Sequence, residues 1–321
     1  MSSNYGNFDS FCRYSNLPAC NLFDYDYQQH CALRGFTTAG NGRIENLGLM
    51  LISFFACITC LLFIYTAQRR TAAVGRREMQ ILFFSYLILS ISAIFASGGF
   101  IFNRTILVYF SAIEIGATAA TAWLLVVNAI VAYQILPDGG FLSVSLTFLS
   151  GLAFFIGVGY IALDSAFNWT NTFDSAPSRP ELMRNYALYT TYLLWPILAI
   201  SLYLILQFNL VVRVLRERKP LLLLFPAFIL FVIGQIFEFV ISRYICSGTT
   251  GHIDGSMFAC LFTLFSFGGL WAFWTDITED HWIDPAVEWV RPDPLPNMRE
   301  VIPLSNANFS SSFVHSVPRN V

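Results

Sequence analysis

The stretch NLGLMLISFFACITCLLFIYT, residues Asn46–Thr66, contains no charged side chain and is followed closely by Arg69 and Arg70. About twenty apolar residues in a helix match the hydrocarbon core of a bilayer, which is roughly 30 Å thick. A helix satisfies its own backbone hydrogen bonds inside that core, so this stretch predicts a transmembrane helix. Six similar stretches follow: Met79–Gly99, Ile106–Ile135, Leu142–Asp164, Tyr186–Val212, Leu221–Ile245 and Ser256–Trp274. We therefore predict an all-α, polytopic membrane protein with seven transmembrane helices.

The composition agrees with this fold class. Hydrophobic residues make up 56% of the 321 residues and charged residues only 12%, which leaves too little polar surface for a soluble domain of this length. The net charge of −2 argues against a nucleic-acid partner. No apolar segment of the signal-peptide type precedes Asn46, so we expect the first span to act as its own insertion signal. We divide the chain into a cysteine-bearing N-terminal segment (1–45), a seven-helix bundle in the lipid bilayer (46–274) and an acidic, proline-rich tail (275–321).

The basic residues near the spans gather in two loops and predict the orientation. The first loop holds Arg69, Arg70, Arg76 and Arg77, and the fifth holds Arg213, Arg216, Arg218 and Lys219. The positive-inside rule places both loops in the cytoplasm. The N-terminus is then lumenal and the C-terminus cytoplasmic.

Three glycosylation sequons can be compared with this orientation. Asn168-Trp169-Thr170 falls in the fourth loop, on the lumenal side, and is the expected glycosylation site. Asn103 is also placed on that side but lies close to the membrane. Asn308 falls in the cytoplasmic tail, where it should stay unmodified.

Four of the seven cysteines, Cys12, Cys20, Cys31 and Cys246, map to the predicted lumenal side. An even number of cysteines in an oxidising compartment predicts two disulfides, and the three possible pairings remain open. The other three lie inside spans, where a cysteine most often serves as a small apolar side chain: Cys57, Cys60 and Cys260.

The sequence offers few candidate catalytic groups. The four histidines never share a helix at a metal-ligand spacing, so we expect no metal site: His30, His252, His281 and His315. The only lysine, Lys219, lies in a loop, which excludes a retinal Schiff base within a span. The third span ends in Ala132-Tyr133-Gln134 and lacks the acidic-arginine pair of G-protein-coupled receptors. We predict that the chain is not an enzyme and needs no cofactor.

Two acidic residues lie within spans, Glu114 in the third and Glu238 in the sixth. A buried acid costs about 2.5–3.5 kcal/mol on insertion scales, so such residues mark functional sites by default. One interpretation is a proton or ion pathway, and another is a polar contact for the helix of a client protein. The alternative is an internal partner, for example Gln235 or Arg243 for Glu238. We name Glu114 and Glu238 as candidate client contacts.

Several short motifs, in order along the chain, resemble the fungal chitin synthase export chaperones. They are Phe11-Cys12 with Leu17-Pro18-Ala19-Cys20, Thr71–Glu78, Gly234-Gln235, Ile245-Cys246, His252-Ile253-Asp254-Gly255, Phe273-Trp274 and Thr278-Glu279-Asp280. The resemblance extends from Phe11 to about Asp284. It implies a membrane chaperone of the endoplasmic reticulum that binds a chitin synthase and permits its export, in support of cell-wall chitin synthesis. It assigns no role to Glu114 or Glu238.

The main alternative is a seven-helix receptor or a small-molecule transporter, in which the two buried acids would line a ligand cavity. Co-purification separates the two hypotheses, because only a chaperone requires a stable membrane-protein partner. The tail carries neither a dilysine retrieval signal nor a lumenal retention tetrapeptide at its last residues, Pro318-Arg319-Asn320-Val321. Onward traffic with the client is therefore compatible with the sequence.

Overall fold

The structure is a computed structural model. It describes residues 5–13, 15–23, 33, 35–37, 43–70, 73–134, 139–170, 172–173, 184–216, 218–249 and 251–278. Cys31 and the tail beyond Thr278, with its sequon at Asn308, lie outside the described residues.

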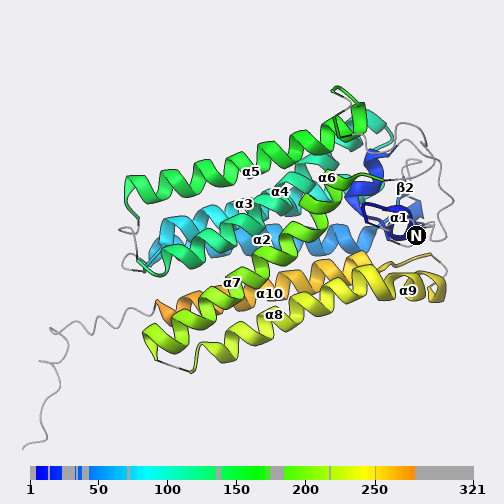
Figure 1. Cartoon of the computed structure of the whole chain (residues 1–321). Coiled ribbons are helices and arrows are strands. Elements are labelled where there is room, and N and C mark those ends of the chain that lie inside the picture. The colour runs from blue at the N-terminus through cyan, green and yellow to red at the C-terminus, as the bar shows by residue number, and fades with distance from the viewer. Residues whose placement is uncertain are drawn as a thin grey trace, which may run out of the picture. The chain divides into compact units, whose positions relative to one another are not determined.

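Within the described residues, seven helices are long and apolar enough to cross a membrane, which confirms the predicted fold class. They are α2 (Leu47–Arg69), α3 (Arg76–Ser97), α4 (Arg104–Val131), α5 (Phe141–Phe167), a continuous helix Tyr186–Leu215, a continuous helix Leu221–Gly248, and α10 (Gly255–Ile277) (Figure 1). Their ends lie within a few residues of the predicted spans. The largest difference is at α4, which ends at Val131 rather than Ile135, and the other ends differ by three residues or fewer.

The two continuous helices change their winding along their length. The first consists of α6 (Tyr186–Leu188), the π-helical turn η2 (Tyr189–Leu194), α7 (Trp195–Asn209) and a second π-helical turn, η3 (Leu210–Leu215). The second consists of α8 (Leu221–Ile236), the π-helical turn η4 (Phe237–Ile241) and α9 (Ser242–Gly248). Such turns are rare and are often found at functional sites. Glu238 lies in η4.

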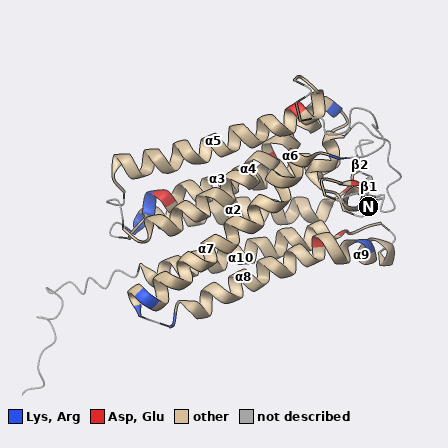
Figure 2. Ribbon diagram, viewed as in Figure 1, with Lys and Arg blue, Asp and Glu red and all other residues tan. Residues whose placement is uncertain are grey.

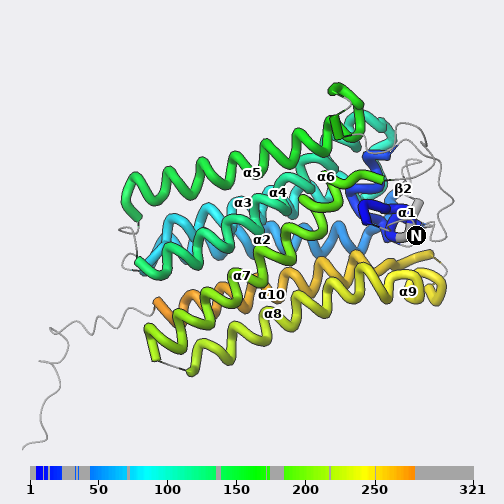
Figure 3. The backbone as a smooth tube through the Cα atoms, in the orientation of Figure 1, coloured from blue at the N-terminus to red at the C-terminus, as the bar shows by residue number. Residues whose placement is uncertain are grey.

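The helix α4 forms the centre of the bundle, since 72% of its most apolar window is buried, against 22–44% for the other six helices. Helices α2, α3, α4 and α5 pack as successive neighbours, α7 lies against α4, and α8 pairs with α10, which also contacts α2. Figure 3 follows this path as a tube and shows α7 crossing the bundle diagonally. The hydrophobic core runs between these helices and includes Leu82, Phe83 and Phe273.

Small side chains allow α4 and α5 to approach closely. A Cβ atom on Gly116 would lie 2.7 Å from the backbone oxygen of Phe155, which is shorter than real contacts of this kind. Ala112 lies one turn earlier, and its backbone oxygen would lie 3.7 Å from a Cβ atom on Gly159 of α5. Small residues at a spacing of four are typical of close helix pairs in membranes.

The described part of the N-terminal segment packs against one end of the bundle. It contains α1 (Asp9–Cys12) and the 3₁₀ helix η1 (Pro18–Leu22), and β1 (Phe36–Thr37) pairs antiparallel with β2 (Arg43–Ile44). We call residues 5–23 the cap and this end of the bundle the capped end. Side chains of the cap join a buried cluster with α4, α5 and η2.

The opposite end carries the two arginine-bearing junctions, between α2 and α3 and between η3 and α8, and we call it the arginine end. Figure 2 shows blue segments at both junctions and a few more at the capped end.

Glu78 lies among these arginines but is fully buried in the first turn of α3. Its Oε1 accepts hydrogen bonds from Ser143 Oγ (2.6 Å) and from the backbone nitrogen of Gly139 (3.2 Å). Glu78 therefore ties the start of α3 to the start of α5.

Candidate functional site

A cavity of about 260 Å³ lies inside the bundle near the capped end, and we call it the lateral cavity. It is bounded by α2, α3, α4, η2, α7, α8, η4 and α10, with residues of the cap at one side. Its lining is mixed, because serine, threonine and tyrosine side chains interrupt a mainly aliphatic and aromatic wall. The predicted client-contact residues Glu114 and Glu238 both line this cavity.

Neither carboxyl group has a hydrogen-bond partner among the described residues. Glu238 is 7% exposed, and Glu114 has a buried Oε2 without a partner. The internal partners considered for Glu238 are not engaged: no hydrogen bond joins it to Gln235, and Arg243 stacks on Tyr244, 4.4 Å from the ring centroid. The described residues that line the cavity include no lysine, arginine or histidine. Two acidic groups thus share one cavity whose described lining residues carry no positive charge.

The cap closes the cavity on the side of the capped end. Leu17 and Pro18 line it, and Leu17 is buried. Ser15 Oγ donates a hydrogen bond of 2.6 Å to the backbone oxygen of Glu238, and Phe11 packs edge-on against Phe239, with 5.5 Å between the ring centroids. The cap is therefore attached to the π-helical turn that carries Glu238.

One side of the cavity lies at the gap between α7 and α8. These two helices have little contact; Phe208 and Phe225 approach near the arginine end, with 6.2 Å between their ring centroids. In Figure 1, α7 runs diagonally away from α8 toward the capped end. Ile197 of α7 lines the cavity and is 60% exposed, which places it on the rim facing the exterior of the bundle.

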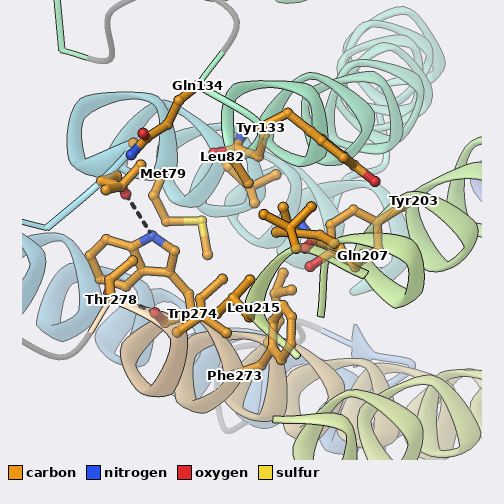
Figure 4. A pocket seen from close by; sticks show the side chains of 18 residues that line it. Met79, Leu82, Tyr133, Gln134, Tyr203, Gln207, Leu215, Phe273, Trp274 and Thr278 are labelled. Atoms are coloured by element: carbon orange, nitrogen blue, oxygen red, sulfur yellow. Dashed lines mark hydrogen bonds between the residues drawn. The ribbon is translucent and has the colours of Figure 1, made fainter. Parts of the chain in front are cut away.

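A second cavity, of about 270 Å³, lies at the arginine end between α3, α4, α7, η3 and α10, and Figure 4 shows its side chains. Trp274 Nε1 donates to the backbone oxygen of Val74 (3.2 Å), and Tyr133 donates to that of Leu206 (2.7 Å). Gln207 is 4% exposed, and its buried Oε1 has no partner among the described residues. Sequence reasoning missed Gln207, although a glutamine inside the apolar span Tyr186–Val212 is a signal that could have found it.

The structure brings two of the four predicted disulfide cysteines together. Cys12 and Cys20 form a disulfide within the cap, with 5.6 Å between their Cα atoms. Cys246, in α9, is also disulfide-bonded, and Cys31 lies outside the described residues. Cys57, Cys60 and Cys260 are free and lie in α2 and α10.

Asn168 ends α5 at the capped end and is exposed. It adopts a left-handed conformation with φ of 51°, and its backbone nitrogen donates to the oxygen of Asp164 (2.8 Å). The Thr170 hydroxyl of the same sequon donates to Asp164 Oδ2 (2.9 Å).

The starts of α2 and α10 share a buried polar cluster at the capped end. Asn46 donates to Asp254 Oδ1 (3.0 Å) and to Ser256 Oγ (2.9 Å), and Ser256 donates to the same Asp254 oxygen (2.6 Å). Burial raises the pKa of the Asp254 carboxyl above its usual value, although the hydrogen bonds from Ser256 and Asn46 lower it in part. The motif residue Asp254 thus joins the starts of α2 and α10 by hydrogen bonds.

Across the described ranges, no group of three or more histidine, cysteine or acidic side chains could hold a metal ion.

The fold and the cavities define a class: a seven-helix membrane protein with an acidic intramembrane cavity closed by a disulfide-bonded cap. Residues 4–287 match the family model described as chitin synthase export chaperone. The chain belongs to this family.

Curated relatives with the same description cover most of the chain. One from Coccidioides immitis is 27% identical over 284 residues, covering 86% of this chain and 83% of the relative. One from Candida albicans is 28% identical over 289 residues, covering 86% and 90%. One from Cryptococcus neoformans is 28% identical over 289 residues, covering 86% and 75%. No solved structure matches the chain.

These comparisons confirm the resemblance found in the sequence and the function that it implies, a chitin synthase export chaperone. They do not favour the receptor or transporter alternative. The family is named for a chaperone and not for an enzyme.

Proposed function

We propose that this protein binds a chitin synthase in the endoplasmic reticulum membrane, assists its folding there and permits its export toward the cell surface. The observation that carries the proposal is the family match over residues 4–287, which includes all seven apolar helices. The client of such a chaperone is itself a membrane protein, so contact between helices in lipid is the expected mode of binding.

The proposed orientation places the capped end in the lumen and the arginine end in the cytoplasm. Three features support it. The Cys12–Cys20 disulfide suits an oxidising compartment, the exposed sequon at Asn168 lies at the capped end, and the two arginine-bearing junctions lie at the other. We also propose that Cys31 and Cys246 form the second disulfide.

Within this function, Glu114 and Glu238 are the proposed client contacts. Their carboxyl groups face the lateral cavity without partners among the described residues, and an acidic side chain inside a membrane is costly to leave unpaired. The protein itself supplies no chemistry in this account, so the purified chain alone makes no chitin.

Co-purification from membranes tests the proposal. The tagged protein, expressed at its native level and solubilised in a mild detergent, should retain a chitin synthase as a major partner. An unrelated seven-helix protein of the same membrane, treated in the same way, is the control. If no chitin synthase is retained, and the isolated protein instead binds or transports a small molecule, the receptor or transporter alternative replaces the proposal.

A further inference from the structure

We propose that the lateral cavity accepts one positively charged side chain, an arginine or a lysine, that enters from the lipid through the gap between α7 and α8 and belongs to a transmembrane helix of the client. This inference rests on the proposed chaperone function and adds to it the chemistry of the client and its route of entry.

The charge of the ligand follows from the lining. Glu238 is 7% exposed and Glu114 Oε2 is buried, and neither carboxyl group has a hydrogen-bond partner or a basic neighbour among the described lining residues. Two acidic groups in one low-dielectric cavity repel each other when both are ionised. A guanidinium or ammonium group between them relieves this repulsion and donates to both.

The size of the cavity indicates that a side chain enters and a whole helix does not. A helix with its side chains is about 10–12 Å across. The volume of about 260 Å³ is well above the roughly 10–15 Å³ that one water molecule needs, but it is too small for a helix. The client helix therefore lies outside, along α7 and α8, and only its long basic side chain reaches Glu114 and Glu238.

The route of entry follows from the walls. The cap closes the cavity at the capped end, where Ser15 is bonded to the Glu238 backbone and Leu17 is buried against the bundle. At the gap between α7 and α8 the cavity is lined by apolar Ile197, which is 60% exposed, and by Phe231 of α8. A partner that reaches this gap comes from the lipid, which favours a membrane helix over a soluble ligand.

A basic residue in the middle of a transmembrane helix is expensive in lipid and requires a partner there. In a synthase subunit that has not yet assembled, such a residue does not yet have its partners in place. A chaperone with an acidic cavity can shelter it until assembly, and this chemistry distinguishes a client helix from an ordinary apolar helix.

The test uses designed single-span helices of leucine and alanine that carry arginine or leucine at the central position. Each is co-expressed with the full-length protein, and the ratio of arginine helix to leucine helix that co-purifies is measured. We expect a ratio of at least ten with the wild-type protein and with the control Asp276→Asn, which changes an acid outside the cavity. In the double variant Glu114→Gln, Glu238→Gln the ratio should fall close to one.

A second variant provides an independent test in case the double variant misfolds. Ile197→Trp narrows the gap at an exposed position, leaves both carboxyl groups in place and should also bring the ratio close to one. A ratio near one in the wild-type protein overturns the inference. So does a ratio that stays high in Ile197→Trp, or in the double variant when that protein is present at wild-type abundance.

The surface delivery of chitin synthase, measured in cells lacking the protein, separates the two proposals. If a synthase is retained in those cells but the designed helices are not distinguished, the inference is wrong and the proposed function stands. If every synthase still reaches the surface, the proposed function itself is wrong.

Discussion

The hydroxyl of Ser15 donates a 2.6 Å hydrogen bond to the backbone oxygen of Glu238, which joins residues 223 positions apart. Ser15 lies inside the loop closed by the Cys12–Cys20 disulfide, and Glu238 lies in the π-helical turn η4. The disulfide-bonded loop is therefore attached directly to the helix that carries a carboxyl group into the lateral cavity. The conformation of the cap and the geometry of the cavity are expected to depend on each other.

Removal of the cap disulfide tests how far this disulfide stabilises the folded protein. We expect the double variant Cys12→Ser, Cys20→Ser to lower the free energy of unfolding by about 2–4 kcal/mol, because the loop is no longer restricted in the unfolded chain. Thermal unfolding of the purified protein in detergent measures the change. Cys57→Ser, at a free cysteine in α2, is the control and should have a much smaller effect. Equal unfolding temperatures for the wild-type protein and the cap variant would contradict the structural role of the disulfide.

The buried carboxyl of Asp254 predicts a pH dependence with a defined sign. Burial raises the pKa of Asp254, so the folded state binds a proton more tightly than the unfolded chain does. Its contribution to stability is complete below the unfolded pKa of about 4 and is lost as the pH rises through the folded pKa. Relative to Asp254→Asn, the wild-type protein should unfold at a progressively lower temperature as the pH is raised from about 4 to about 7. A constant difference between the two proteins would exclude this assignment.

The close approach of α4 and α5 can be tested with a matched pair of glycines. Gly116→Ala places a Cβ atom 2.7 Å from the backbone oxygen of Phe155, so the helices must separate. We expect a loss of about 1–3 kcal/mol in the free energy of unfolding. Gly157→Ala, in α5 with no neighbouring atom within 4 Å, should be neutral or stabilising. Similar effects of both substitutions would show that the helices are not closely packed at Gly116.

Glycosylation of Asn168 tests the orientation. Asn168 is exposed at the end of α5, so the protein should show a mobility shift that Asn168→Gln and glycosidase treatment both remove. Asn308→Gln is the control and should leave the shift unchanged. A shift removed by Asn308→Gln but retained in Asn168→Gln would reverse the proposed orientation.

The seven helices could be predicted from the sequence because each apolar stretch carries its own signal, namely a length that fits the bilayer and the absence of charge. Glu78 shows where this reasoning fails. Hydropathy places it in the basic loop before Met79, whereas the structure buries it in the first turn of α3, where Ser143 and the backbone of Gly139 donate to it. Those donors come from α5 and from the turn that precedes it, and a linear pattern does not contain that information.

The candidate site was predictable only in part. Glu114 and Glu238 stand out as acids within apolar spans, but their common cavity depends on the divergence of α7 from α8 and on the position of the cap. Gln207 attracts less notice because an uncharged amide costs less in a hydropathy profile. The cysteines predicted two disulfides without their pairing, since pairing is decided by the distance between Cα atoms, 5.6 Å for Cys12 and Cys20.

We expect that a chitin synthase depends on this protein for export. The most direct measurement is the fraction of each tagged chitin synthase that reaches the cell surface in cells lacking the protein, before and after the wild-type chain is restored. We expect at least one synthase to be retained in the endoplasmic reticulum and to be delivered again when the wild-type chain is restored. Full surface delivery of every chitin synthase in the absence of the protein would contradict it.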